Sequence, residues 1–355
     1  MPEDQLLRLG ERTVAGTMPP HLTRQNRIDQ FEFALAVAAV FLAPANFLRH
    51  PSFYLTLGDV FTFACLALML LRGTVPGRPF NSGTPIWIVG LMLLVSGLLV
   101  SSITNGDSFR GTIVSAQYFT AYFVVPLVIL QRPLWQVSIL VKTFVLSIFV
   151  MGLHGIYLIH IDGEVFTRFV SGSGRLMSFV ERENECASLF AMTFPLLFWL
   201  VEKRYIRSST FLICFAIFAY GIVLTGSNTG LLGMLYACFV YLALTSLSSL
   251  RRLTLVVIGA TALVFLLSLV GDELGRTVLP PVFQERVLAA LQSGDLAQAG
   301  TFTARYELIL EGLERVENSI LLGVGADQYR LLSDLGHVVH NAYLLSLIHI
   351  SEPTR

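Results

Sequence analysis

Residues 134–161 read LWQVSILVKTFVLSIFVMGLHGIYLIHI, an apolar run that contains one formally charged side chain, Lys142. A helix rises about 1.5 Å per residue, so roughly 20 apolar residues cross the hydrocarbon core of a bilayer, which is about 30 Å thick. This run is long enough to do so. The sequence therefore predicts a transmembrane helix here.

Eight further apolar runs accompany this segment. They cover residues 31–48, 53–71, 85–103, 112–130, 186–201, 209–225, 231–247 and 253–270. The nine predicted spans contain only three charged side chains, Glu32, Asp59 and Lys142. We expect an all-α fold, a polytopic transmembrane helix bundle with a large, partly helical loop outside the membrane.

The composition excludes several classes of protein. Of the 355 residues, 54% are hydrophobic and 14% are charged, whereas roughly a quarter are charged in a soluble domain. The net charge is zero, which argues against nucleic acid as a partner because phosphate binding needs a basic face. The four cysteines lie in or beside spans, and no metal-ligand spacing or nucleotide-binding loop occurs, so no metal and no cofactor is expected.

The basic residues predict the orientation. With the N-terminus in the cytoplasm, 12 of the 24 Lys and Arg residues lie in the N-terminal tail and the cytoplasmic loops, as the positive-inside rule requires. The predicted regions are a cytoplasmic tail at 1–30, the nine-helix region at 31–270, and a large loop at 271–340. Residues 341–355 begin a further span that we expect to be truncated, with a non-native tail at 347–355.

The large loop has a helical pattern of its own. From Thr301, apolar residues recur at helical spacing opposite acidic ones, which predicts an amphipathic helix. Gly323 and Gly325 follow it and predict a turn where the backbone approaches a ligand or another helix. His340 lies near the end of the loop.

The external loops contain the side chains best suited to chemistry. Arginine binds phosphate through a bidentate fork, and histidine near neutral pH accepts a proton from a hydroxyl. Taken singly, each such arginine is more often a solvated residue than a ligand. Asp59 and Lys142 lie inside spans, where a charge is costly, and a structural pair or a water-filled cavity explains them as well as a catalytic role does.

Four fragments in order resemble the O-antigen ligase and polymerase family, integral-membrane glycosyltransferases that act on undecaprenyl-pyrophosphate-linked glycans. They are RLMSFVERENECASLFAMTFPLL (175–197), LTGSNTGLLGML (224–235), TARYELILEGLERVENSILLGVG (303–325) and HVVHNAYLL (337–345). In the first fragment Arg175, Asn184 and Ala187 occupy the matching places. One departure is Asn228, which follows Ser227 where the family usually has arginine; Arg182 or Arg168 is a candidate substitute.

The resemblance implies an enzyme of the bacterial inner membrane with its active face in the periplasm, in lipopolysaccharide or polysaccharide biosynthesis. It would transfer a glycan from an undecaprenyl-pyrophosphate donor to a lipid A core or another sugar hydroxyl, without metal and with inversion. His340 would be the base and Arg305 would stabilise the leaving pyrophosphate. The implied substrate-binding residues are Arg175, Arg182, Asn341, Gly323, Gly325 and Ser227.

Three alternatives remain at this stage. A polymerase of the same family would use the same donor and the same face, although one loop of about 70 residues ending in His-Asn favours the ligase. A transporter of polyprenyl glycans or other solutes would depend on intramembrane charges such as Asp59 and Lys142. A structural subunit of an envelope complex has no positive support in the sequence.

Overall fold

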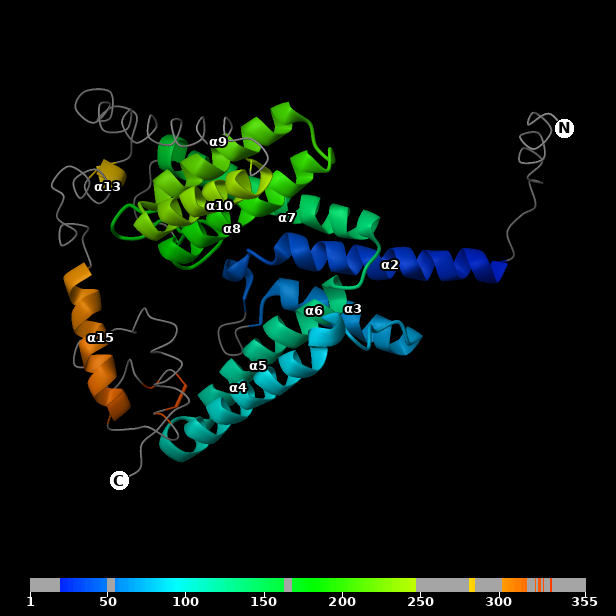
Figure 1. Cartoon of the computed structure of the whole chain (residues 1–355), viewed down its shortest axis with the longest axis horizontal. Helices are drawn as coiled ribbons and strands as arrows, with labels where there is room; N and C mark the ends of the chain where they lie inside the picture. The colour runs from blue at the N-terminus through cyan, green and yellow to red at the C-terminus, as the bar shows by residue number, and fades with distance from the viewer. Residues whose placement is uncertain are drawn as a thin grey trace.

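The computed structural model describes residues 20–49, 55–162, 168–246, 281–284 and 302–317, together with residues 323, 325, 326, 328 and 333. Within these residues the regular structure is helical (Figure 1), which confirms the all-α prediction. In the same part of the chain, β-type pairing is limited to two isolated bridges, Arg49 with Thr56 and Val170 with Leu176.

The helices follow one another with mostly short connections. Their bounds are α2 (Pro20–Leu42), α3 (Leu57–Arg72), α4 (Thr84–Asn105), α5 (Ser108–Phe119), α6 (Val125–Ile129), α7 (Leu134–Tyr157), α8 (Glu183–Glu202), α9 (Ser208–Thr225), α10 (Asn228–Ser246), α13 (Pro281–Phe283) and α15 (Phe302–Glu317). A π-helical turn, Thr120–Val124, joins α5 to α6, and another, Leu158–Asp162, extends α7.

Five helical segments are long and apolar enough to cross a membrane, judged by length and composition. They are Asn81–Asn105, Ser108–Ile129, Leu134–Asp162, Glu183–Glu202 and Ser208–Thr225, and a shorter apolar segment covers Asn228–Tyr241. The chain is therefore a multi-pass membrane protein, and five of the predicted spans coincide with these segments.

Two predicted spans have shifted boundaries in the structure. The first was expected at 31–48, but α2 begins at Pro20, within the predicted tail, and ends at Leu42. The second was expected from residue 53, but α3 begins at Leu57, because Thr56 and Asp59 form a capping box there. The predicted span at 253–270 lies outside the described residues.

The helices form two groups with α2 between them. In Figure 1, α7, α8, α9 and α10 lie above α2, whereas α3, α4, α5 and α6 lie below it. α8 packs against α9 and α10, and α4 packs against α5. Because α2 packs against both α3 and α7, it joins the two groups.

Aromatic rings fill the core of the upper group. Phe190, Phe194 and Phe218 are fully buried, and the rings of Phe194 and Phe218 meet edge to face at 6.1 Å. A Cβ on Gly221 would lie 2.6 Å from the Phe190 ring, so only glycine leaves room for that ring. Lipid is as apolar as these side chains, so close packing of this kind, and not transfer out of water, stabilises helix pairs in a membrane.

The π-helical turn between α5 and α6 has a local cause. Pro126 has no N–H and cannot donate to the carbonyl of Tyr122, four residues earlier. The indole Nε1 of Trp87 on α4 donates to that carbonyl instead, at 2.8 Å. The proline therefore leaves an acceptor that a neighbouring helix uses, which ties α4 to this irregular helix.

We name the two ends of the bundle after the segments that lie at each. The loop end carries the last turns of α4 and α9 and the first turns of α8 and α10, with α13 and α15 on the same side, at the left of Figure 1. The N-terminal end carries the first turn of α7 and the start of α2, at the right. Phe283 of α13 is buried against Val223 and Leu231, so part of the large loop packs on the bundle.

The charges predicted inside spans have structural partners. Asp59 Oδ2 accepts hydrogen bonds from the backbone N–H and the hydroxyl of Thr56, at 2.9 and 2.8 Å. Lys142 Nζ lies 5.3 Å from the ring centre of Tyr205, a cation–π distance. Glu32 is ion-paired with Arg72 and Arg132 at the N-terminal end. Of the three explanations offered for Asp59 and Lys142, these contacts favour a structural role, with Thr56 and Tyr205 as the respective partners.

Candidate active site

Arg175 lies at the centre of a polar cluster at the loop end. Its Nε donates to the carbonyl oxygen of Thr225 at 2.7 Å, and its Nη2 donates to Asn184 Oδ1 at 3.1 Å. Its Nη1 lies 3.7 Å from Glu183 Oε1. Arg175 is only 6% exposed, so its guanidinium is a buried, hydrogen-bonded cation. We call Arg175, Glu183, Asn184, Thr225 and Ser227 the Arg175 cluster.

Ser227 completes this cluster from the neighbouring helix. Its Oγ donates to Asn184 Oδ1 at 3.0 Å and accepts from the backbone N–H of Gly230 at 3.3 Å. The second contact caps the first turn of α10. Asn184 Oδ1 thus accepts from both Arg175 and Ser227. The structure therefore brings together two predicted site residues that are 52 positions apart in the chain.

A tight hairpin positions Arg175. Val170 pairs with Leu176 across it, and the backbone N–H of Ser171 donates to the carbonyl of Arg175 at 2.9 Å. Gly174 has φ +75°, a conformation that favours glycine. The N–H of Leu176 also donates to the carbonyl of Leu224 at 3.0 Å. The hairpin is therefore fixed to the last turn of α9, which aims the arginine at Thr225.

Small residues hold the first turns of α8 and α10 together. A Cβ on Gly230 would lie 2.6 Å from the Cβ of Ala187, and one on Gly233 would lie 3.2 Å from that of Ala191. Such a stripe of small residues lets two helix backbones approach closely in a membrane. Two helix N-termini, each with a partial positive charge, thus lie side by side at the Arg175 cluster.

Arg182 differs from Arg175 in its exposure. It precedes α8, its side chain is 62% exposed, and its Nε lies 3.7 Å from Glu185 Oε1. Arg168, the other candidate to replace the arginine missing at 228, donates to the carbonyl of Phe47 at 2.8 Å. Arg168 is thus bonded to the connection between α2 and α3, whereas Arg182 is an exposed cation beside the Arg175 cluster.

The predicted glycine turn docks on α4. Gly323 and Gly325 have φ +59° and +91°. A Cβ on Gly325 would lie 3.0 Å from the Cα of Gly106. Asn105 Nδ2 donates to the carbonyl of Gly323 at 2.9 Å. The sequence left open whether this backbone approaches a ligand or another helix, and in the structure it approaches the end of α4.

Two histidines, His154 near the end of α7 and His160 in the π-helical turn that follows it, lie at the same end. His160 Nε2 is 2.7 Å from the hydroxyl of Tyr220, and the two rings are stacked. The ring of His154 packs between those of Phe169 and Phe179, with centroids 5.0 and 4.7 Å away. The positions of both imidazole rings are therefore explained by packing against aromatic neighbours.

Three predicted site residues fall partly or wholly outside the described part of the chain. The backbone of Arg305 lies in the first turn of α15, but its side chain is not described. His340 and Asn341 lie outside the described residues. The predicted roles of these three residues stay predictions.

The loop end is suited to an anionic group outside the membrane. It combines two adjacent helix N-termini with the buried cation Arg175 and the exposed cation Arg182, which is the pattern that binds phosphate oxygens. Glu183 and Glu185 in the first turn of α8 offset part of this charge. Among the described residues, no group of three His, Cys, Asp or Glu side chains is placed to hold a metal ion.

Comparison with known proteins identifies the segment that contains much of this end. Residues 213–348 match the family model described as O-antigen ligase. This segment is similar to the O-antigen ligase family. No curated protein and no solved structure was found to match the chain. The family segment includes Ser227, the glycine turn, α15 and the His340–Asn341 pair, and Arg175 precedes it.

Three partners in the Arg175 cluster were missed as site residues. Asn184 was noted only as a motif position, although its side chain joins Arg175 to Ser227. Its fixed spacing from Arg175 in the O-antigen ligase-like fragment was the available signal. The carbonyl of Thr225 gave no signal, because a backbone acceptor is not visible in a sequence. Glu183 contacts Arg175 through its side chain, but no motif position marked it.

Proposed function

We propose that the protein transfers a glycan from an undecaprenyl-pyrophosphate donor to a sugar hydroxyl at the loop end of the bundle. The observation that carries this proposal is the Arg175 cluster, in which residues of two family-like fragments share one acceptor, Asn184 Oδ1. The match of residues 213–348 to the O-antigen ligase family model supports the glycosyltransferase class. The loop end would face the periplasm and the N-terminus the cytoplasm of a bacterial inner membrane.

The exposure of the two arginines suggests different parts for them. Arg182 would contact the pyrophosphate directly, since it is exposed beside two helix N-termini. Arg175, which is buried and paired with Glu183, would set the positions of α8, α9 and α10 and add positive charge beneath the phosphates. Arg305, at the start of α15, would supply a second direct contact from the large loop.

His340 would act as the general base. It would accept the proton of the acceptor hydroxyl as that oxygen attacks the anomeric carbon and the bond to the pyrophosphate oxygen breaks. Pyrophosphate is a good leaving group when arginines stabilise its charge. One displacement inverts the anomeric configuration, and Asn341 would orient the base or the acceptor.

The test is transfer activity of a His340→Ala variant in membrane vesicles, with a lipid-linked donor and normal expression confirmed by immunoblot. We expect loss of transfer with donor binding retained. His21→Ala is the matched control, because His21 lies in the first turn of α2, at the opposite end of the bundle from the proposed site. Wild-type activity of His340→Ala would overturn the proposed base.

The acceptor separates ligase from polymerase. Product on a lipid A core acceptor supports the ligase that the single large loop favours. Product only on a second lipid-linked repeat unit assigns the protein to the polymerases.

A further inference from the structure

A second polar site lies at the other end of the bundle. There α2, α3 and α7 surround a cavity of about 440 Å³, within the size range of small-molecule sites. Its lining includes Asp29, Glu32, Arg72, Arg132, Trp135 and Gln136. α7 has 24 residues and separates this cavity from the Arg175 cluster by roughly 35 Å. The cavity therefore belongs to neither the donor site nor the acceptor site proposed above.

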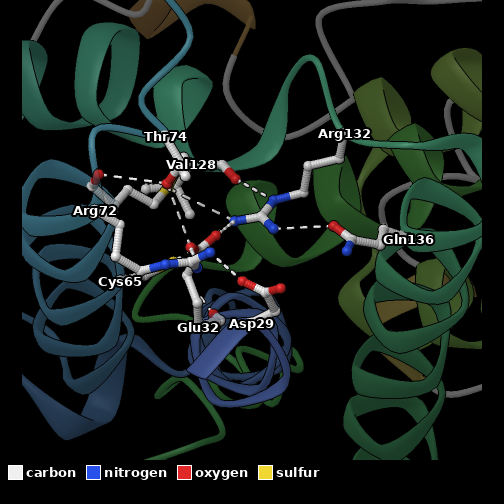
Figure 2. A network of polar contacts seen from close by, with 9 residues as sticks. Asp29, Glu32, Cys65, Arg72, Thr74, Val128, Arg132 and Gln136 are labelled. Carbon is white, nitrogen blue, oxygen red and sulfur yellow. Dashed lines mark hydrogen bonds and ion pairs between the residues drawn. The ribbon is translucent and has the colours of Figure 1, made fainter. Parts of the chain in front are cut away.

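Glu32 holds the inner wall of the cavity together. It is 7% exposed and lies between two arginines, ion-paired with Arg72 and with Arg132 (Figure 2). Arg132 is fully engaged, because its Nε donates to the carbonyl of Val128 at 2.6 Å and its Nη1 donates to Gln136 Oε1 at 3.0 Å. Glu32 and Arg132 therefore have structural roles. A ligand would contact the more exposed pair, Arg72 and Asp29, which we call the outer pair.

The outer pair offers one charge of each sign. Arg72 is ion-paired with Asp29, and their side chains are 18% and 49% exposed. An arginine has five N–H donors, of which Glu32 and Asp29 each accept from one here. Two arginines and two carboxylates make the cavity neutral overall. A ligand that carries both a phosphate and an ammonium fits such a pair better than a net anion does.

The surface next to the cavity is apolar. Phe31, Leu71, Leu134 and Trp135 are 60%, 85%, 73% and 58% exposed. Trp135 lines the cavity, and each of the other three is adjacent in sequence to a lining residue. Tryptophan is enriched where a membrane meets water. A ligand bound to Arg72 and Asp29 would thus lie beside exposed apolar side chains, which acyl chains would cover.

We propose that this cavity binds the headgroup of a zwitterionic phospholipid with a primary ammonium, that is, a phosphatidylethanolamine. The phosphate would accept hydrogen bonds from Arg72, and the ammonium would donate to the half-exposed carboxylate of Asp29. The bound lipid would cover the apolar rim and join α2, α3 and α7 at this end of the bundle. The proposal holds whether or not the transfer reaction does.

The test uses the full-length protein, delipidated in detergent and titrated with lipids of identical acyl chains in native mass spectrometry. We expect phosphatidylethanolamine to bind more tightly than phosphatidylcholine or phosphatidylglycerol. Asp29→Asn removes the negative charge that would pair with the ammonium without burying a charge, and we expect it to weaken phosphatidylethanolamine binding roughly fivefold, to the level of phosphatidylcholine. Asp29→Glu keeps the carboxylate and should keep the preference.

The controls address folding and specificity. Glu202→Gln removes an exposed acid at the same end of the bundle, on α8, and should leave lipid binding unchanged. Thermal unfolding in detergent shows whether Asp29→Asn remains folded. Equal binding of the ethanolamine and choline lipids to the unchanged protein would overturn the proposal, as would a preference for phosphatidylglycerol. Displacement of the lipid by equimolar glycerophosphoethanolamine would overturn the role of the acyl chains.

Discussion

The backbone N–H of Ala326 donates to Ser102 Oγ at 3.0 Å, across 224 positions of sequence. With the bond from Asn105 to the carbonyl of Gly323, this contact fastens the large loop to the last turns of α4. Among its described residues, the loop contacts the bundle here and where Phe283 packs against Val223 and Leu231. The position of α15, and of Arg305 with it, depends on both contacts.

Gly325→Ala should loosen the loop. An alanine there would be strained at φ +91°, and its Cβ would lie 3.0 Å from the Cα of Gly106, at a cost of about 1–3 kcal/mol. We expect faster limited proteolysis of the loop in membranes and lower transfer activity. Gly73→Ala is the matched control, since it has φ +64° but open space around it and lies at the opposite end of α3 from the loop end. Equal cleavage of Gly325→Ala and the unchanged protein would contradict the docking role.

Arg175→Gln should lower stability and activity together. The change removes the charge beside Glu183 and at least one of the hydrogen bonds to Thr225 and Asn184. We expect a loss of about 2–4 kcal/mol, seen as a lower midpoint of thermal unfolding in detergent. Arg175→Lys keeps the charge without the planar fork, so its unfolding midpoint should lie between those of the glutamine variant and the unchanged protein. A glutamine variant as stable as the unchanged protein would show that the cluster does not organise the loop end.

Arg182→Ala should affect activity alone. The side chain is 62% exposed with one long contact, so stability should stay within about 0.5 kcal/mol. Loss of a charge-assisted hydrogen bond to the donor should reduce transfer at least roughly tenfold. Arg207→Ala, which removes an exposed arginine at the N-terminal end of α9, serves as control. If both variants keep full activity across donor concentrations, Arg182 does not touch the pyrophosphate.

Asp59→Asn distinguishes an enzyme from a transporter. Because the carboxylate caps α3 through Thr56, its loss should cost about 1 kcal/mol of stability and leave transfer unchanged. Measurement of transfer and of unfolding in the same preparation checks both. Abolished function of a stably folded Asp59→Asn, together with an active His340→Ala, would instead support transport.

The sequence predicted the helices well and the contacts between them poorly. Apolar runs of 16 or more residues have few folds open to them in lipid, since every backbone polar group must be bonded internally. The extra turns at the start of α2 escaped prediction because residues 20–30 are polar. A hydropathy scan identifies segments that are stable in the hydrocarbon core, and it gives no signal for a polar extension of the same helix.

The sequence predicted Arg175 of the candidate site but did not predict the groups that accept its hydrogen bonds. Arg175 and Ser227 were predicted because their residue types fit phosphate chemistry and their surroundings resemble a family. The structure places them in one cluster, and their substrate-binding role stays a prediction. Their shared partner, Asn184, needed the packing of α8 against α10. The network around Glu32 was missed for a similar reason. Arg72 and Arg132 were read as orienting charges in separate loops, and only the fold brings them to one carboxylate.

The contact between Gly230 and Ala187 also bears on the asparagine at position 228. Backbone proximity places α10 against α8, and it does not involve the side chain at 228, which begins the helix. An arginine or an asparagine there would leave both helices in the same place and alter only the local charge. The close approach of α8 and α10 thus rests on small residues, Gly230 and Ala187, so the charge at position 228 can be changed by mutation without filling the space between the two helices.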